Sequence, residues 1–319
     1  GMGKEDQKTI EVTGNATESQ TMKWVDFNVS YEALCQAYEW DGSTYESEVH
    51  LNWIELLAYI GTKYGGEFNK NGKKIQKDMD QLATKLCAGE TTLEELTKEM
   101  EYYNYFLTAY TSILGGMVGE YSIAGLDENG VSIWTDQYGL KAFSPVAKGF
   151  EYSHFDDFGT SRSYGYKRQH LGHDMMGQVG TPIIAIESGY IEAIGWNQYG
   201  GWRIGIRSLD GTRYYYYAHL RQNYPYAEGL EEGSLVTAGY VIGYMGHTGY
   251  STKENVNNIQ VTHLHWGMEL IFDEERRAEG YEVWIDIYPL TKFLYKNRSE
   301  AYKVEGTKEW KRVYEMKDN

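Results

Sequence analysis

The sequence predicts an α+β protein with more than one domain, in which an all-α part precedes an all-β part built on an antiparallel sheet. Two changes of pattern along the chain support this prediction. Between about residues 30 and 121, apolar residues recur at the three- and four-residue spacing of one helix face. After Gly116, glycine becomes frequent, and short runs alternate between apolar and polar residues as strands do.

Three segments of the first part are expected to be helices. Residues 52–64 and 73–89 each place apolar side chains on one helix face, and the second segment ends on a glycine, a common C-cap. Residues 91–114 continue the helical spacing. Their two opening threonines are followed by two glutamates, which predicts a capping box at Thr91 or Thr92.

Short strands separated by turns are expected in the second part. Residues 181–196 indicate two strands around a glycine turn. Residues 202–220 indicate a hairpin across Asp210 and Gly211, a dipeptide that favours tight hairpin turns. Between residues 231 and 250, five glycines mark tight corners between very short strands.

The expected domain boundaries follow from these changes of pattern, together with a polar start that lacks apolar periodicity. We predict a disordered arm at residues 1–28, a helical domain at 29–120, a linker at 121–145, a β domain at 146–295 and a C-terminal tail at 296–319.

The composition excludes one class of partner but does not decide the cellular compartment. The net charge is −16, so the chain should repel polyanions, and nucleic acid is excluded as an expected partner.

Two cysteines, Cys35 and Cys87, fit either one disulfide in an exported protein or two buried thiols. No segment has the length of a membrane span. Gly1 before Met2 is typical of a scar left by tag removal, which allows for a preceding signal or membrane anchor.

The histidines point to the chemistry. Seven of the eight lie between residues 154 and 265. His170 and Asp174 are four residues apart, and His219 follows a run of four tyrosines and an alanine, near the end of an expected strand. His263 and His265 share one face of an expected strand, because side chains on a strand alternate. Imidazoles with a carboxylate suit a divalent transition metal, zinc above all, and three protein ligands would leave a fourth position open to water.

These segments together resemble the M23 family of zinc peptidases, the lysostaphin and LytM type. The resemblance covers about residues 146–295 and rests on an ordered set of motifs. They are "HLGHD" from residue 170, "GTPIIAIESGYIEAIG" from 180, "YYYYAHL" from 214, "VTAGYVIGYMGHTGYST" from 236 and "THLHWGMEL" from 262. The upstream "DFGTSR" (157–162) is similar to a further family element. The resemblance implies a fold of the duplicated-hybrid or barrel-sandwich type.

The resemblance also implies roles for individual residues. His170, Asp174 and His265 would bind Zn²⁺, and His219 and His263 would be catalytic without ligating the metal. His173 falls at a variable family position, and we expect it at the surface or in contact with the metal ligands rather than with the metal.

The implied activity is that of a zinc metalloendopeptidase. It would cleave the cross-links or stem peptides of bacterial peptidoglycan through a zinc-activated water. The expected partners are peptidoglycan peptides, and the expected location is extracellular, at the cell wall. Oligomeric state, scissile bond and the division of labour between His219 and His263 stay open.

Two departures from the family pattern stand out, and neither removes an implied site residue. A longer polar loop, residues 253–262, precedes His263 and is expected to border the cleft. The family's H-L-H-F is H-L-H-W here.

The alternative function is a catalytically inactive scaffold of the same fold that binds a cell-envelope protein or glycan. The complete set of five implied site residues favours the enzyme.

Overall fold

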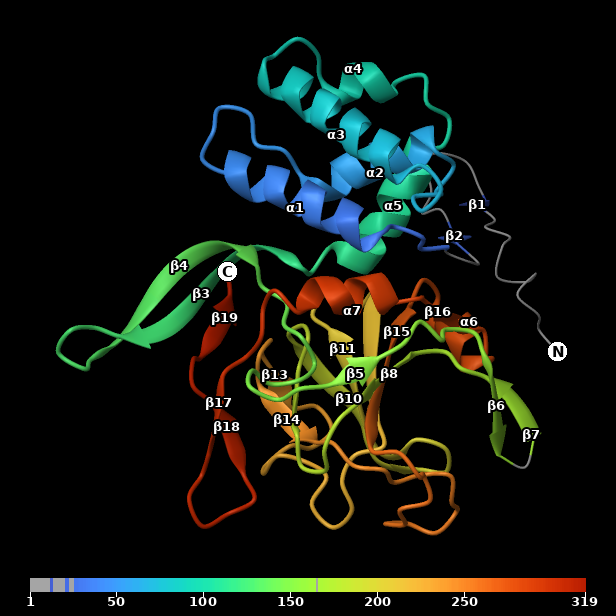
Figure 1. The fold of residues 1–319 in the computed structure, drawn as a ribbon, viewed down its shortest axis with the longest axis vertical. Helices are drawn as coiled ribbons and strands as arrows, with labels where there is room; N and C mark the ends of the chain where they lie inside the picture. The colour runs from blue at the N-terminus through green and yellow to red at the C-terminus, as the bar shows by residue number, and fades with distance from the viewer. Residues whose placement is uncertain (1–11, 14–20, 23–25, 165) are drawn as a thin grey trace. The chain divides into compact units, whose positions relative to one another are not determined.

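The computed structural model describes residues 12–13, 21–22, 26–164 and 166–319. The chain divides into two compact units, Gly1–Gly115 with Phe272–Glu275, and Gly116–Ile271 with Arg276–Asn319. Most of the arm expected at residues 1–28 lies outside the described residues. The structure consists mainly of antiparallel sheet preceded by a helical region (Figure 1), as the sequence predicts.

The first unit contains five helices among its described residues (Figure 1). They are α1 (Tyr31–Thr44), α2 (Trp53–Lys63), α3 (Gly72–Cys87), α4 (Leu93–Thr97) and α5 (Tyr103–Leu114). The Asn52 side chain caps α2 by accepting hydrogen bonds from two backbone N–H groups of its first turn. Helix α3 ends before Gly89, whose φ of 73° is the left-handed conformation of a C-cap glycine. Cys35 and Cys87 are both thiols.

The helix expected at residues 91–114 is interrupted, and this part of the prediction is wrong. Thr92 caps α4 by accepting from the Glu95 N–H at 3.1 Å, as expected, but α4 ends at Thr97. Helix α4 buries no residue, whereas α5 buries an apolar face that includes Tyr110 and Ile113. The helical spacing of the sequence continues across residues 98–102, so it does not show where the helix is interrupted.

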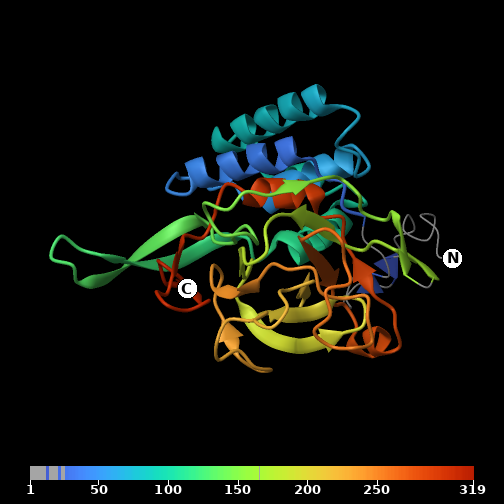
Figure 2. The ribbon, with the colours of Figure 1, turned by 60° about the horizontal axis from the view of Figure 1, so that its bottom comes forward.

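The second unit is built on an eight-stranded sheet with the order β13-β10-β11-β12-β15-β8-β5, in which β16 also pairs with β15. Its strands are β5 (Ser153–His154), β8 (His173–Met176), β10 (Gly189–Asn197), β11 (Gly201–Ser208), β12 (Arg213–Ala218), β13 (Leu235–Val236), β15 (His263–Leu270) and β16 (Val283–Trp284). All the pairings are antiparallel. The hairpin across Asp210 and Gly211 joins β11 to β12 as predicted, and Figure 2 shows the curvature of these strands.

Shorter pairs of strands complete the second unit. They are β9 (Pro182–Ile184) with β14 (Val241–Tyr244), β6 (Ser161–Tyr164) with β7 (Tyr166–Gln169), and β17 (Ala301–Lys303) with β18 (Trp310–Arg312). The segment expected to be all-β also contains two short helices, α6 (Glu274–Ala278) and α7 (Tyr288–Leu294). Each is at most seven residues long, too short for its spacing to be recognised in the sequence. No helix among the described residues has the length and apolar character needed to cross a membrane.

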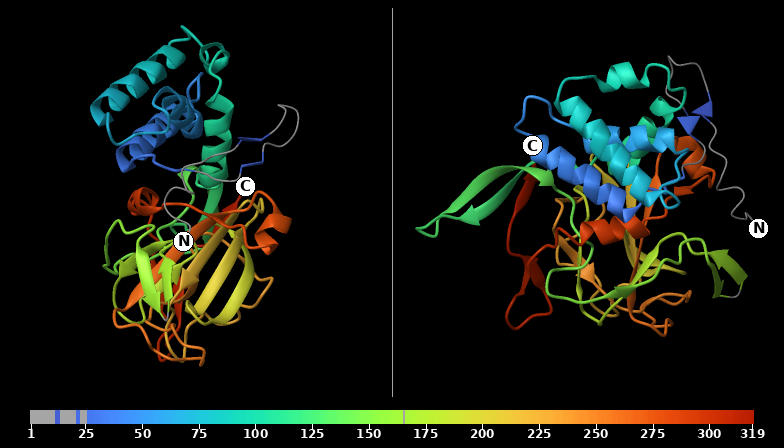
Figure 3. Two further views of the ribbon diagram at one scale, coloured as in Figure 1. Left: turned by 90° about the vertical axis from the view of Figure 1, so that its right-hand side faces the viewer. Right: turned by 45° about the horizontal axis from the view of Figure 1, so that its top comes forward.

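The segments expected as linker and tail have regular structure. Residues 121–145 contribute to the hairpin of β3 (Val118–Leu126) and β4 (Ser132–Leu140), and β19 (Met316–Asp318) pairs with β3 (Figure 3). Tyr121 and Met316 are buried in one apolar cluster with Phe143 and Tyr244. Their contacts are distant in sequence, so local patterns do not reveal them.

The packing of Tyr121 predicts where the chain can be shortened. A chain that begins at Gly116 should keep this cluster, whereas one that begins at Lys141 loses β3 and the Tyr121 ring. Removal of a large buried aromatic side chain costs about 3–5 kcal/mol. We therefore expect the shorter chain to unfold at a clearly lower urea concentration. Equal urea midpoints for the two chains would show that β3 contributes nothing to this core.

Candidate metal centre and its groove

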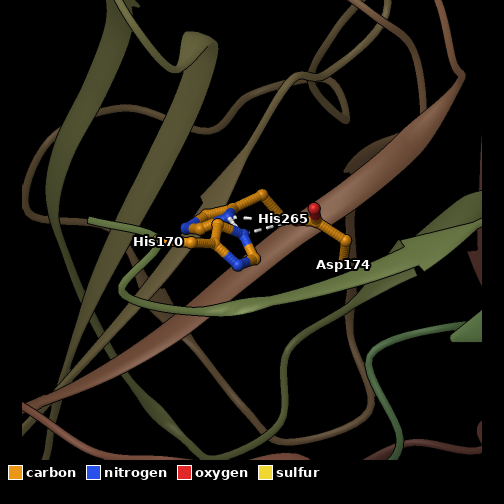
Figure 4. A group of neighbouring side chains, drawn as sticks. All are labelled: His170, Asp174 and His265. Carbon is orange, nitrogen blue, oxygen red and sulfur yellow. Dashed lines mark hydrogen bonds and ion pairs between the residues drawn. The ribbon is translucent and has the colours of Figure 1, made fainter. Parts of the chain in front are cut away.

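Two neighbouring strands and the turn before one of them bring the three predicted metal ligands together (Figure 4). Asp174 on β8 is the register partner of His265 on β15, so both side chains leave the same face of the sheet. His170 lies just before β8. Its Nε2 is 2.9 Å from Asp174 Oδ1 and 3.0 Å from His265 Nδ1, and those two atoms are 3.2 Å apart.

The donor atoms suit a divalent transition metal. Among the described residues, His170, Asp174 and His265 form the group of histidines and carboxylates that could hold a metal ion. Donors that bind zinc at 2.0–2.1 Å with tetrahedral angles lie roughly 3.3 Å apart, close to the separations found here. Three ligands from the protein leave a fourth position for water or substrate, which is the arrangement of catalytic zinc sites.

The local electrostatics keep Asp174 ionised and His265 neutral, which are the forms that bind a metal. Burial alone would raise the pKa of Asp174, but hydrogen bonds from His170 and His265 outweigh burial and hold that pKa well below its usual range. Burial also lowers the pKa of His265. At neutral pH the set is therefore a carboxylate with a neutral imidazole at His265, as metal binding requires.

Gly172 makes the turn between His170 and Asp174 possible. A Cβ atom at this position would lie 2.5 Å from the His265 ring and 2.7 Å from the Trp266 carbonyl oxygen. Any side chain at residue 172 would therefore push the His265 imidazole or the backbone of β15 away.

We predict that Gly172→Ala weakens zinc binding by about 10- to 100-fold, the usual effect of disturbing the surroundings of a metal ligand. Competition with a chromophoric chelator would measure the affinity. Gly125→Ala, at a glycine with no atom within 4 Å of the added Cβ, is the matched control. Unchanged affinity in Gly172→Ala would mean that the turn does not position His265.

His219 and His263 lie beside the three candidate ligand side chains and are not part of that group. Their rings are 4.8 Å apart, and the His263 Nε2 is 3.7 Å from Asp174 Oδ1. The Nδ1 atoms of His219 and His263 are hydrogen-bonded to the carbonyl oxygens of Thr248 (2.9 Å) and Val261 (2.7 Å). Because a carbonyl accepts, each Nδ1 carries the proton, and each Nε2 is left as the proton acceptor.

His219 also has an unusual backbone and a shifted pKa. Its φ of 62° is left-handed, a conformation that few residues other than glycine adopt, and such strain is common at functional sites. Burial, and then the neighbouring His263 and His265 rings, hold the pKa of His219 well below its usual range. His219 is therefore neutral at physiological pH, which leaves its Nε2 unprotonated.

A groove with a volume of about 1000 Å³ runs past these five side chains. The loop at residues 253–262 borders it, as expected, through Asn258, Ile259, Gln260 and Val261. The loop is held in place because the His247 Nδ1 is hydrogen-bonded to the Ile259 carbonyl oxygen at 2.7 Å, and the Ile259 N–H donates to the His247 carbonyl oxygen.

The placement of His173 differs from the prediction that it lies at the surface or against the metal ligands. Its side chain leaves β8 on the face opposite Asp174 and is 2% exposed. Its Nε2 is 2.7 Å from the Nδ1 of His154, and burial is the main reason that its pKa falls to about 3. The alternation along β8 could have shown this, because residues 173 and 174 must face opposite sides.

Sequence reasoning also missed side chains that adjoin the ligands. The Asp157 Oδ1 is 3.5 Å from His170 Nδ1, and the Tyr216 ring is 5.8 Å from the His265 ring. Tyr216 is the third residue in a run of four tyrosines. It lies two residues before Ala218, the register partner of His265, so the pairing of β12 with β15 places it beside the metal centre, and the sequence alone does not show that register.

The part of the chain that holds this site is similar in sequence to known proteins. The family model of Peptidase family M23 matches residues 168–278. The L-Ala–D-Glu endopeptidase of Bacillus subtilis is 39% identical over 124 residues, which are 39% of this chain and 36% of that protein. The lysostaphin of Staphylococcus simulans is 39% identical over 89 residues, which are 28% of this chain and 17% of that protein.

One solved structure resembles most of the chain. The crystal structure of a LytM protein from Ruminococcus gnavus has a TM-score of 0.56 at 22% identity, over 86% of this chain and 91% of that one, and so shares the fold. The matches to the two curated relatives span little more than a third of their length at most.

Proposed function

We propose, on the premise that residues 168–278 belong to peptidase family M23, that this chain is a zinc-dependent endopeptidase of bacterial peptidoglycan. The observation that carries the proposal is the convergence of five side chains on one groove: His170, Asp174, His219, His263 and His265. The Bacillus subtilis relative is named as an L-Ala–D-Glu endopeptidase, and a relative from Staphylococcus capitis, 38% identical over 94 residues, is named as a glycyl-glycine endopeptidase. Because peptidoglycan lies outside the cytoplasm, the place of action would be the cell wall.

The three ligand side chains would hold the metal. Zinc, when bound, would lower the pKa of a bound water to about 7 and polarise the carbonyl of the scissile bond. His170 and His265 are held near Asp174 by the turn at Gly172 and by the β8–β15 register, so the donor set is organised by the fold itself. Such preorganisation limits the reorganisation needed when metal and substrate bind.

The two flanking histidines would handle protons. In each ring a backbone carbonyl holds the proton on Nδ1, so Nε2 can accept the proton of the attacking water. After protonation the same ring can donate to the leaving amine or to the developing oxyanion. The two rings are 4.8 Å apart, close enough to act on one reacting group.

Mass spectrometry of peptides released from several purified wall types tests the proposal. Walls with glycine bridges and walls with direct cross-links should be digested in parallel by the zinc-loaded chain. We expect new peptide fragments from at least one type, and their ends would identify the scissile bond. A zinc-loaded chain that binds walls but releases no fragment from any of them would instead support the inactive scaffold.

A further inference from the structure

The groove is different at its two ends. Near His219 its lining is polar and neutral, with Asn197, Tyr199, Tyr250 and Asn258. The other end contains Trp284 and Glu282, and Tyr216 lies between the two ends, since a Cβ on Gly200 would be 2.1 Å from its hydroxyl oxygen. Among the lining residues that the structure describes, the charged side chains besides the histidines are Asp157, Asp174 and Glu282, and none is Lys or Arg.

A line of aromatic rings leads from the metal centre to this second end. The Tyr216 ring is 5.8 Å from the His265 ring and 6.1 Å from the Trp284 ring, edge to face in both cases. Gly267, on β15 opposite Tyr216, leaves room for Trp284, because a Cβ there would lie 2.8 Å from the indole. The missing side chain lets the Trp284 ring pack closely against β15 at Gly267, where the ring lines the groove.

The Trp284 ring is hydrogen-bonded to the Glu282 carboxylate, which also lines the groove. Its Nε1–H donates to Glu282 Oε2 at 2.8 Å, and Glu282 is exposed to solvent. A carboxylate positioned at the edge of an indole ring is suited to an ammonium group, which can pair with the carboxylate while it lies over the ring face. Gly267 is two residues from His265, or roughly 7 Å along the strand, which is also about two residues of an extended peptide.

Building on the proposed function, we infer that Trp284 and Glu282 bind a free ammonium group on the substrate, about two residues from the scissile bond. Stem peptides contain a diamino acid whose second amine is free until it is acylated in a cross-link. The substrate class that this site fits is therefore the stem peptide that is not cross-linked through its diamino acid.

Two matched peptides test this inference. The first is N-acetyl-L-Ala-γ-D-Glu-L-Lys-D-Ala, and the second is the same peptide acetylated on the lysine Nζ. For the zinc-loaded chain we expect acetylation to lower kcat/KM by about 10-fold, mainly through KM, from the loss of one ion pair and one cation–π contact. Glu282→Gln should reduce this preference to less than about 2-fold, and Glu279→Gln, which removes an equal charge at an exposed position outside the groove lining, should keep it.

Binding to the full chain held in chelator separates this inference from the proposed function. Calorimetry should show the same preference in Kd under conditions where no hydrolysis occurs. Equal Kd values for the two peptides, or a preference that persists in Glu282→Gln, would overturn the inference even if both peptides are cleaved. A preference in Kd that depends on Glu282, without cleavage of either peptide after zinc is supplied, would support the ammonium site and contradict the endopeptidase.

Discussion

Replacing His170, Asp174 or His265 with alanine is expected to empty the metal site and to abolish hydrolysis of wall peptide. Each variant leaves two of the three donors that now lie 2.9–3.2 Å apart. Loss of one ligand should weaken zinc binding by about 10²- to 10³-fold, a fraction of the free energy that zinc sites supply. Elemental analysis and chelator competition would measure the zinc content and its affinity.

The control and the pH dependence sharpen this prediction. Asp156→Ala, at an exposed carboxylate near the groove, should keep the metal. In the parent chain, zinc affinity should fall as the pH falls, because protons compete for the imidazoles. Since burial lowers the pKa of His265, that ligand should stay neutral below the ordinary histidine range. If the His265→Ala variant still binds a full complement of zinc, His265 is not a metal ligand.

His263→Ala is expected to keep zinc and to lose turnover by about 10²- to 10⁴-fold, the contribution of one positioned proton-transfer group. The His263 Nε2 lies 3.7 Å from Asp174 Oδ1, beside the donor set, and its Nδ1 is engaged by the Val261 carbonyl. His219→Ala should behave in the same way. Because residues that act as a unit are not additive, the double variant should lose less than the product of the two single losses.

Kinetics on one wall peptide, with zinc counted in every sample, would check this assignment. His173→Ala serves as a histidine control on the opposite face of β8, since its expected defect is in stability rather than in turnover per zinc-loaded molecule. If His263→Ala empties the metal site while His265→Ala retains zinc, the two roles are exchanged. Full activity in His219→Ala and His263→Ala would exclude both from proton transfer.

The sequence predicts the clustering of the site better than it predicts the extent of the domain around it. His263 and His265 alternate with Leu264 along one strand, and the turn at Gly172 lies between His170 and Asp174, so local geometry already groups these side chains. The resemblance to a family then orders the groups from separate segments. The assignment of ligand and catalytic roles among the five residues stays a prediction that the variants above test.

Local patterns in the sequence do not reveal contacts between segments that lie far apart along the chain. Tyr121 packs in a cluster with Met316, almost two hundred residues later, and β19 pairs with β3. The alternation along β8 gives the face on which His173 lies, but its contact with His154 depends on a second strand. The ring contacts from Tyr216 to Trp284 depend on two strands that both pair with β15. Each of these features is set by tertiary packing, which propensity and spacing do not encode.

The release of new amino groups from purified peptidoglycan tests the central claim most directly. The amino groups should be counted after digestion by the zinc-loaded chain, by the same chain in chelator, and by that chain after zinc is restored, with Asp174→Asn alongside. We predict release by the loaded chain, none in chelator, recovery when zinc returns, and none from Asp174→Asn at any stage. Release that is unchanged by chelation, or absent from a zinc-loaded chain on walls of every cross-link type, would contradict a zinc-dependent peptidoglycan endopeptidase.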